Sequence, residues 1–106
     1  MSEALLAITT LPDRAAAEKL AHALIEQHLA ACVNIGAAVT SVYAWKGRIE
    51  QGEEVLLTMK TTRAAYPALE RAVVAGHPYE LPEVIAIPVT AGLEGYLHWI
   101  DECTKS

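Results

Sequence analysis

Large apolar side chains alternate with small or polar ones along the central stretch of the chain, residues 32–61. The large apolar residues occupy odd positions on both sides of Lys46-Gly47, and they are Val33, Ile35, Val39, Tyr43, Trp45, Val55, Leu57 and Met59. A period of two is that of a half-buried strand, and Lys46-Gly47 supplies a two-residue turn in which glycine accepts positive φ. The pattern therefore predicts one long antiparallel hairpin.

The apolar residues of the two hairpin strands lie on the same face of the sheet only if one strand contains an extra residue. A turn at Lys46-Gly47 pairs odd with even positions, so Val39 would face Glu54 and the two apolar sets would lie on opposite faces of the sheet. We predict a β-bulge in the returning strand at Gln51-Gly52, which would pair Val39 with Val55. The bulge would separate a core-forming base from a tip that overhangs the rest of the domain.

Two apolar runs outside the hairpin predict two further strands. Residues 4–9 form a short continuous apolar run, which is typical of a strand buried on both faces. Residues 83–90 form the second run, and we expect this strand to be buried as well. Its Pro88 must lie at a sheet edge or near the strand end, because proline has no N–H to donate to a neighbouring strand.

Three segments have the pattern of a helix. Residues 14–29 carry one apolar stripe, and Asp13 before them is a good helix cap. Residues 67–75 begin at a proline and end before Gly76, as helices often do. A short C-terminal helix is expected from residue 92 or 93 to about residue 102.

The resulting order, β-α-β-β-α-β followed by a short helix, is typical of an α+β ferredoxin-like sandwich. In that fold four strands carry two helices on one face of the sheet. The predicted elements leave the other face uncovered, and the central hairpin is longer than most. We therefore expect copies of the chain to cover one another's sheets in a homo-oligomer.

Composition and charge restrict the partners of the chain. Its 106 residues are expected to form a single domain, 1–106. The formal net charge of -5 argues against nucleic acid as a partner, and two cysteines do not make a disulfide framework. The chain begins Met1-Ser-Glu-Ala with no leader-like segment and has no apolar run near membrane-spanning length. We therefore expect a cytoplasmic protein without a membrane partner.

Six short segments resemble the CutA family of divalent-cation tolerance proteins. They are Leu29-Ala-Ala-Cys-Val-Asn34, Ser41-x-Tyr43-x-Trp45-x-Gly47, Lys60-Thr-Thr62, His77-Pro-Tyr-Glu-x-Pro-Glu83, Pro88-Val and Gly95-Tyr-Leu-x-Trp99. They cover nearly the whole chain in the family's order, which is far more specific than any one segment. The resemblance implies a ferredoxin-like subunit related in shape to the PII signalling proteins. It also implies a tight homotrimer, and tolerance of copper and other divalent metals without an established enzymatic activity.

His77 and Cys32 are the candidate metal ligands. Relatives proposed to bind copper carry a cysteine where this chain has Thr9 and a second histidine where it has Gly76, so the resemblance implies weak copper binding in which His77 contributes most. His77 also fits a solvated or capping loop histidine. Cys32 follows His28 by four residues, and sulfur with imidazole suits copper or zinc. We favour the alternative, in which Cys32 is a buried small apolar side chain.

Lys60, Tyr79, Glu80 and Glu83 are predicted to form a polar cluster between a strand end and a loop. A lysine and several carboxylates in contact shift one another's pKa values. Such a cluster either pins the loop through ion pairs, which we favour, or lines a small-molecule pocket.

Three large aromatic residues are candidate contacts between subunits. Tyr43 and Trp45 lie at the hairpin tip, and we expect them to anchor a subunit interface rather than to pack on their own hairpin. Trp99 either caps the core or packs on a neighbouring subunit.

The predicted function is therefore divalent-metal tolerance, with copper bound weakly and no catalytic residues. A PII-like regulator with ligands in clefts between subunits is the alternative, supported only by the cluster around Lys60, since no phosphate-binding glycine loop is present. An acylphosphatase-like hydrolase is a weaker alternative. It would need a glycine-rich anion loop with an arginine after the first strand, where this chain has Thr9-Thr-Leu-Pro-Asp13.

Overall fold

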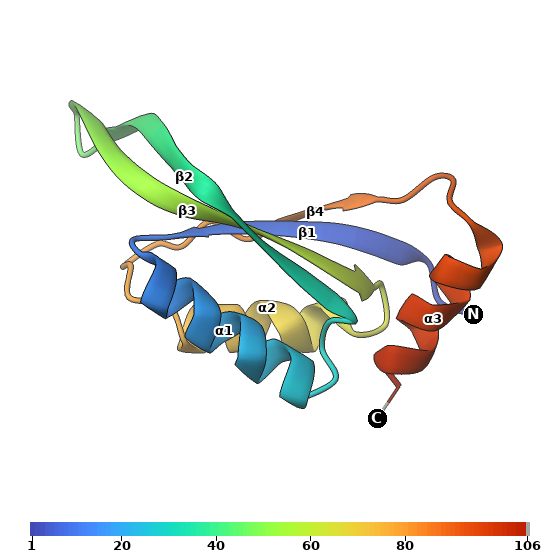
Figure 1. The fold of residues 1–106 in the computed structure, drawn as a ribbon. Helices are drawn as coiled ribbons and strands as arrows, with labels where there is room; N and C mark the ends of the chain where they lie inside the picture. Colours follow the sequence, from blue (N-terminus) through green and yellow to red (C-terminus); the bar gives the residue numbers. More distant parts are fainter. Residues whose placement is uncertain (106) are drawn as a thin grey trace.

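The computed structural model describes residues 1–105 and shows a four-stranded antiparallel sheet with helices (Figure 1). The elements are β1 (Ala4–Leu11), α1 (Arg14–Glu26), β2 (Cys32–Trp45), β3 (Arg48–Thr62), α2 (Tyr66–Ala75), β4 (Ile85–Pro88) and α3 (Glu94–Cys103). The strand order in the sheet is β2-β3-β1-β4. This confirms the α+β class and the predicted order of elements.

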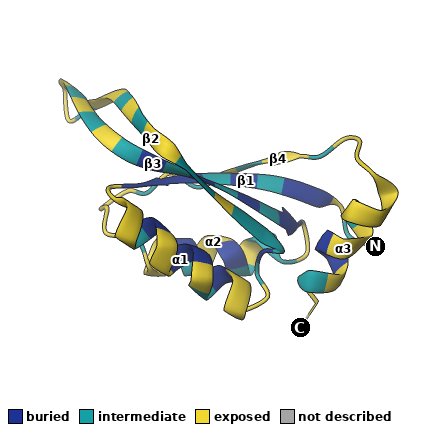
Figure 2. Ribbon diagram, in the orientation of Figure 1, coloured by how far each residue is buried: buried dark blue, intermediate teal, exposed yellow. Residues whose placement is uncertain are grey.

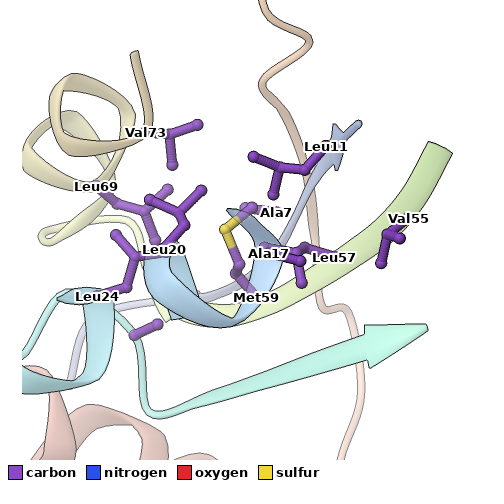
Figure 3. Close-up of a cluster of buried hydrophobic side chains, with 11 residues drawn as sticks. Ala7, Leu11, Ala17, Leu20, Leu24, Val55, Leu57, Met59, Leu69 and Val73 are labelled. Carbon is purple, nitrogen blue, oxygen red and sulfur yellow. The ribbon is translucent and has the colours of Figure 1, made fainter. Parts of the chain in front are cut away.

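The core lies between the sheet and the helices α1 and α2, which pack on the same face of it (Figures 1 and 3). Its buried side chains are Ala7, Leu11, Ala17, Leu20, Leu24, Ala30, Val55, Leu57, Met59, Leu69 and Val73. Odd positions of β1 and β3 therefore point toward the helices. Each fully buried large aliphatic side chain contributes about 1.5–3 kcal/mol to folding relative to an exposed one.

Helix α1 begins as predicted and ends earlier than predicted. The Asp13 carboxylate accepts a hydrogen bond of 2.8 Å from the N–H of Ala16, which satisfies one unpaired donor of the first turn. The helix stops at Glu26 because His28 takes a left-handed φ of 58°. The N–H of Leu29 then reaches back to the carbonyl of Leu24, at 2.9 Å, and closes the helix end.

The hairpin turn is also as predicted. Trp45 pairs with Arg48, and both turn residues have positive φ, 52° for Lys46 and 79° for Gly47. The mirror-image turn that this requires matches the twist of the two strands.

The predicted bulge at Gln51-Gly52 is wrong, because these residues pair without interruption. The register shift lies in the other strand, between Ile35 and Ala38 of β2. Gly36 explains why the shift lies in β2. A Cβ built on Gly36 would lie only 3.1 Å from the carbonyl oxygen of Leu56, so the backbones of β2 and β3 approach closely at the residue that has no side chain.

The shifted register gives pairs that differ from the expected ones. Val39 faces Glu54 and not Val55. Toward the base of the hairpin, Ile35 faces Leu57, and the apolar residues of both strands then share the helix-covered face.

Strand β4 is shorter and more exposed than the predicted buried strand over 83–90. It spans Ile85–Pro88, pairs only with β1 at the sheet edge, and ends at Pro88 as the missing N–H requires. The side chains of Ile85 and Ile87 are 52% and 51% exposed. The apolar run was a correct sign of a strand, but the structure leaves one face of that strand uncovered.

The uncovered side of the sheet, here called the open face, is aliphatic. Ile85 pairs with Ile8, and Ile87 pairs with Leu6, so these four side chains project from the face opposite the helices. Leu56 of β3 joins them, since its odd-numbered neighbours point into the core. Figure 2 shows the exposed residues of β4 and of the hairpin tip.

Helix α3 packs at the end of the sheet where β1 begins (Figure 1). Its buried Asp101 accepts a hydrogen bond of 3.1 Å from the N–H of Ser2, and this bond holds the pKa of the Asp101 carboxyl below its ordinary value. Within residues 1–105, no helix has the length and hydropathy needed to cross a bilayer.

Candidate functional site

A cleft of about 780 Å³ opens between the outer half of the β2–β3 hairpin and the loop that follows α2. The end of β1 contributes to its wall. The lining residues are Thr10, Ser41, Val42, Tyr43, Trp45, Glu54, Pro78, Tyr79, Glu80, Leu81, Pro82 and Glu83. Segments far apart in the sequence therefore meet here, which makes the cleft the strongest candidate for a functional site.

Glu54 of β3 is the carboxylate that joins the three walls of the cleft. Its Oε2 accepts a hydrogen bond of 2.8 Å from the Tyr79 hydroxyl and one of 3.1 Å from the Thr10 hydroxyl. Tyr79 lies in the loop and Thr10 on β1, so a single oxygen fixes the loop and two strands relative to one another.

These contacts set the charge states of both partners. Partial burial acts to raise the pKa of the Glu54 carboxyl, but hydrogen bonds from Ser41, Tyr79 and Thr10 outweigh it, and the pKa lies below its ordinary value. Burial, followed by the hydrogen bond to Glu54, raises the pKa of Tyr79 to about 12. At neutral pH, Glu54 is therefore ionised and Tyr79 remains a donor.

His77 holds the start of the loop through both ring nitrogens. The N–H of Tyr79 donates to Nδ1 at 3.2 Å, so Nε2 carries the proton and donates it to the carbonyl oxygen of Thr10 at 2.6 Å. The two rings, His77 and Tyr79, also pack with their centroids 4.7 Å apart. The predicted metal ligand thus has a hydrogen-bond partner within the chain at each ring nitrogen.

A cation of the chain itself lies at the rim of the cleft. The ammonium of Lys46 is 5.5 Å from the centre of the Trp45 ring and 3.6 Å from a carboxylate oxygen of Glu80. Both side chains of the Lys46–Glu80 pair are largely exposed, so the pair contributes little to stability.

The predicted polar cluster is only partly brought together. Tyr79, Glu80 and Glu83 all line the cleft, but Lys60 does not. The Lys60 ammonium lies 5.6 Å from the centre of the Tyr96 ring. Lys60 follows Glu54 by six residues on β3, which separates their backbones by about 20 Å along the strand. The sequence places Lys60 near the end of a strand, but it does not reveal at which end of the sheet the loop after α2 lies.

The two predicted metal ligands, His77 and Cys32, lie toward different ends of the sheet. Cys32 is paired with Lys60, whereas the His77 ring contacts Thr10, whose pairing partner is Leu56. Four residues of strand separate these positions by about 13 Å.

The surroundings of Cys32 fit a small side chain at a strand start. Cys32 is half-buried, and its sulfur lies 4.0 Å from the side-chain oxygen of Asn34. Within residues 1–105 no three His, Cys, Asp or Glu side chains are placed to hold a metal ion together.

The three aromatic residues proposed as interface anchors lie at the surface of the single chain. Tyr43 and Trp99 are 49% and 44% exposed, and Trp45 is half-buried at the cleft rim. Trp99 packs on Tyr96 with the ring centres 5.5 Å apart. Their contact with another subunit stays a prediction.

Sequence reasoning missed Glu54 and Thr10. Nothing local distinguishes Glu54 from the exposed Glu53 beside it. The feature that identifies Glu54 is the pairing register of the hairpin strands. It places Glu54 opposite Val39, on the face of the sheet that carries Thr10.

The sequence and the fold can be compared with those of known proteins. Residues 5–103 match the family described as CutA1 divalent ion tolerance protein. The chain belongs to this family.

Curated relatives agree with this assignment. Protein CutA of Mus musculus is 47% identical over 100 residues, which cover 94% of this chain and 56% of the relative. The divalent-cation tolerance protein CutA of Thermus thermophilus is 44% identical over 97 residues, which cover 92% of this chain and 94% of the relative. The chain thus spans about 56% of the length of the mouse and human relatives.

Solved structures of the family have the same fold. The stable CutA1 from the psychrotrophic bacterium Shewanella superimposes with a TM-score of 0.94 at 47% identity, over 99% of this chain and 98% of that one. The Cut A1 protein of Thermus thermophilus also gives 0.94, at 42% identity over 96% and 99% of the two chains. The family and its mixed α+β fold are therefore established for this sequence.

Proposed function

We propose that this chain acts in the tolerance of divalent metal ions, copper above all, as a cytoplasmic homotrimer of ferredoxin-like, PII-related subunits. It binds copper weakly and catalyses no reaction. The observation that carries the proposal is the family match over residues 5–103, together with relatives named for divalent-cation tolerance in Thermus thermophilus and Citrobacter koseri.

The sheet supports assembly of several copies. Its open face carries five aliphatic side chains, and a second subunit would remove them from water; they are Leu6, Ile8, Leu56, Ile85 and Ile87. The sheet also has two unpaired edges, β2 on one side and β4 on the other. Pairing β2 of one subunit with β4 of the next would give a head-to-tail ring. We propose three subunits for this ring because the sequence resemblance implies a homotrimer.

The state of His77 supports weak copper binding. A copper ion at Nδ1 must displace the N–H of Tyr79, and one at Nε2 must displace the carbonyl of Thr10. Either change leaves a polar backbone group without its partner, which opposes binding. Water or a second subunit would complete the coordination, since the hydroxyl of Thr9 is a poor ligand for copper.

Several observations support a role without catalysis. The relatives' names describe tolerance rather than a reaction. A PII-like regulator is not favoured, because within one chain Lys60 lies away from Tyr79 and Glu80. The cytoplasmic location stays a prediction, since two plant relatives are named chloroplastic and one structural relative is named periplasmic.

Growth under metal stress tests the proposal. Deleting the coding sequence in its own host should lower the copper concentration that halves the growth rate, and supplying the chain again should restore it. A matched challenge with sodium chloride at equal ionic strength should affect both strains equally. Identical copper sensitivity with and without the chain would contradict the proposed role.

A further inference from the structure

Two opposite charges lie at the two ends of the open face, and both come from β3. Even-numbered residues of β3 project from the open face, because their odd-numbered neighbours point into the core. Glu54 and Lys60 are both even-numbered and half-buried, and about 20 Å of strand separates their backbones. Leu56 lies between them, so the open face has an anionic end, an apolar centre and a cationic end.

Neither charge meets an opposite charge of its own chain. Among residues 1–105, no ion pair includes Glu54 or Lys60. The hydroxyls of Tyr79 and Thr10 orient the Glu54 carboxylate without neutralising it. The Lys60 ammonium lies 5.6 Å from the centre of the Tyr96 ring, which is also a neutral partner. Both charges are therefore held in place, and each would gain from a counter-ion that reaches it.

Assembly makes the lack of a counter-ion costly. The proposed homotrimer covers the open face with another copy of the chain, which removes water from Glu54 and Lys60. A charge that loses its water without gaining an opposite charge opposes assembly strongly. The only other cationic residue in the four strands is Arg48, which is exposed beside the hairpin turn. Lys60 is therefore the strand cation that suits Glu54 of a neighbouring copy.

Aromatic side chains accompany both charges. Trp45 lines the same cleft as Glu54, and these two residues are here called the tip patch. Lys60 lies beside Tyr96, on which Trp99 packs, and these three residues are called the α3 patch. The hairpin tip and α3 lie at opposite ends of the molecule (Figure 1). Each contact of a closed head-to-tail ring joins two different patches, and rings around an ion pair keep water away from it.

We infer that the tip patch of one subunit docks on the α3 patch of the next, where the Glu54 carboxylate forms an ion pair with Lys60 of the partner subunit. The inference rests on the proposed homotrimer and gives each of its contacts a direction. This direction agrees with the proposed pairing of β2 with β4 of the next subunit, because α3 follows β4 in the chain. Three copies in a ring make three identical ion pairs, and every Glu54 and Lys60 then has a partner.

A double-mutant cycle on the full chain tests this inference. Light scattering, at a fixed urea concentration that brings dissociation into range, gives the protein concentration at which half of the assembly has dissociated. Glu54→Gln keeps an acceptor oxygen and Lys60→Met keeps the aliphatic stem, and each should raise this concentration about tenfold or more. The double variant should raise it no further than the more damaging single variant. Because about 20 Å separates the two residues within one chain, such coupling arises between subunits.

Charge reversal gives a second readout of the same contact. Glu54→Lys alone places two ammonium groups against each other, and Lys60→Glu alone places two carboxylates together, so each should dissociate the assembly. The chain that carries both substitutions has the same ion pair in the opposite direction and should assemble again. Circular dichroism of each variant shows whether its subunit remains folded.

Matched variants exclude a general effect of charge. Glu26→Gln and Lys19→Met, on the exposed side of α1, should each change the half-dissociation concentration by less than about twofold. Glu50→Gln, on the same face of β3 and nearer the turn, should combine additively with Lys60→Met. A stable trimer in which Glu54→Gln and Lys60→Met are additive, or in which Glu50 is the coupled residue, would overturn the inference and leave the homotrimer standing. A monomeric wild type would overturn both.

Discussion

The hydroxyl of Tyr79 donates a 2.8 Å hydrogen bond to the carboxylate of Glu54 and thereby ties the loop after α2 to the long hairpin. The bond needs Glu54 ionised and Tyr79 protonated. Burial acts to raise the pKa of Glu54, but the hydrogen bonds outweigh it and lower that pKa, while burial and the hydrogen bond to Glu54 raise the pKa of Tyr79 to about 12. Stability should therefore depend on pH through this pair.

The acid limb of the stability profile should depend on Glu54. Because its folded pKa is lowered, the stability it contributes is present above the ordinary value of 4.5 and is lost as the pH falls through the folded pKa. Urea denaturation at fixed protein concentration should show a smaller acid loss for Glu54→Gln than for wild type. Glu26→Gln should keep the wild-type loss, and an unchanged acid limb in Glu54→Gln would contradict this assignment.

Gly36 should be required at the bulge in β2. Gly36→Ala places a Cβ 3.1 Å from the carbonyl oxygen of Leu56, and the strand backbones must separate to admit it. We expect a loss of about 1–3 kcal/mol in the free energy of unfolding. Gly52→Ala is the matched control on β3, since its Cβ would meet nothing within 4 Å and should change stability by less than about 0.5 kcal/mol. Equal losses would show that the bulge does not depend on Gly36.

His28 should be replaceable by glycine with a gain in stability. Its φ of 58° closes the end of α1 and is strained for a residue with a Cβ. His28→Gly should raise the free energy of unfolding by about 0.5–1 kcal/mol. His28→Ala keeps the strain and should give no gain, so thermal unfolding of the two variants separates the backbone effect from loss of the imidazole.

Assembly can be measured by light scattering. Three chains of 11.4 kDa give about 34 kDa, and this mass should persist on dilution to low micromolar concentration. Trp45→Ala should weaken the trimer by at least about 1 kcal/mol per site if the hairpin tip is an anchor. An unchanged dissociation midpoint would show that Trp45 acts only within its own subunit, and a stable monomeric wild type would exclude the trimer.

The order of elements could be predicted because each depends on nearby residues. Asp13 caps α1, and Lys46-Gly47 makes the turn, through contacts of only a few residues in sequence. The parity of apolar positions also showed that one strand of the hairpin needed an extra residue. It could not show which strand, because the position of Gly36 depends on the approach of Leu56 from the strand opposite.

The site was harder to predict because it depends on three-dimensional placement. Lys60 and Tyr79 were grouped by chemistry, but strand geometry holds Lys60 far from the loop. His77 was singled out as a metal ligand, and in the structure both of its ring nitrogens form hydrogen bonds within the chain itself. Glu54 became visible only when pairing brought it beside Thr10.

The most direct test of the proposed metal role is calorimetry of copper binding to the metal-free assembly. Wild type should bind copper measurably, and more weakly than a closed site with four protein ligands. His77→Ala should lose most of this affinity, while His22→Ala, an exposed histidine on α1, should retain it. Equal copper affinity in wild type and His77→Ala, or sub-nanomolar binding in either, would contradict the account.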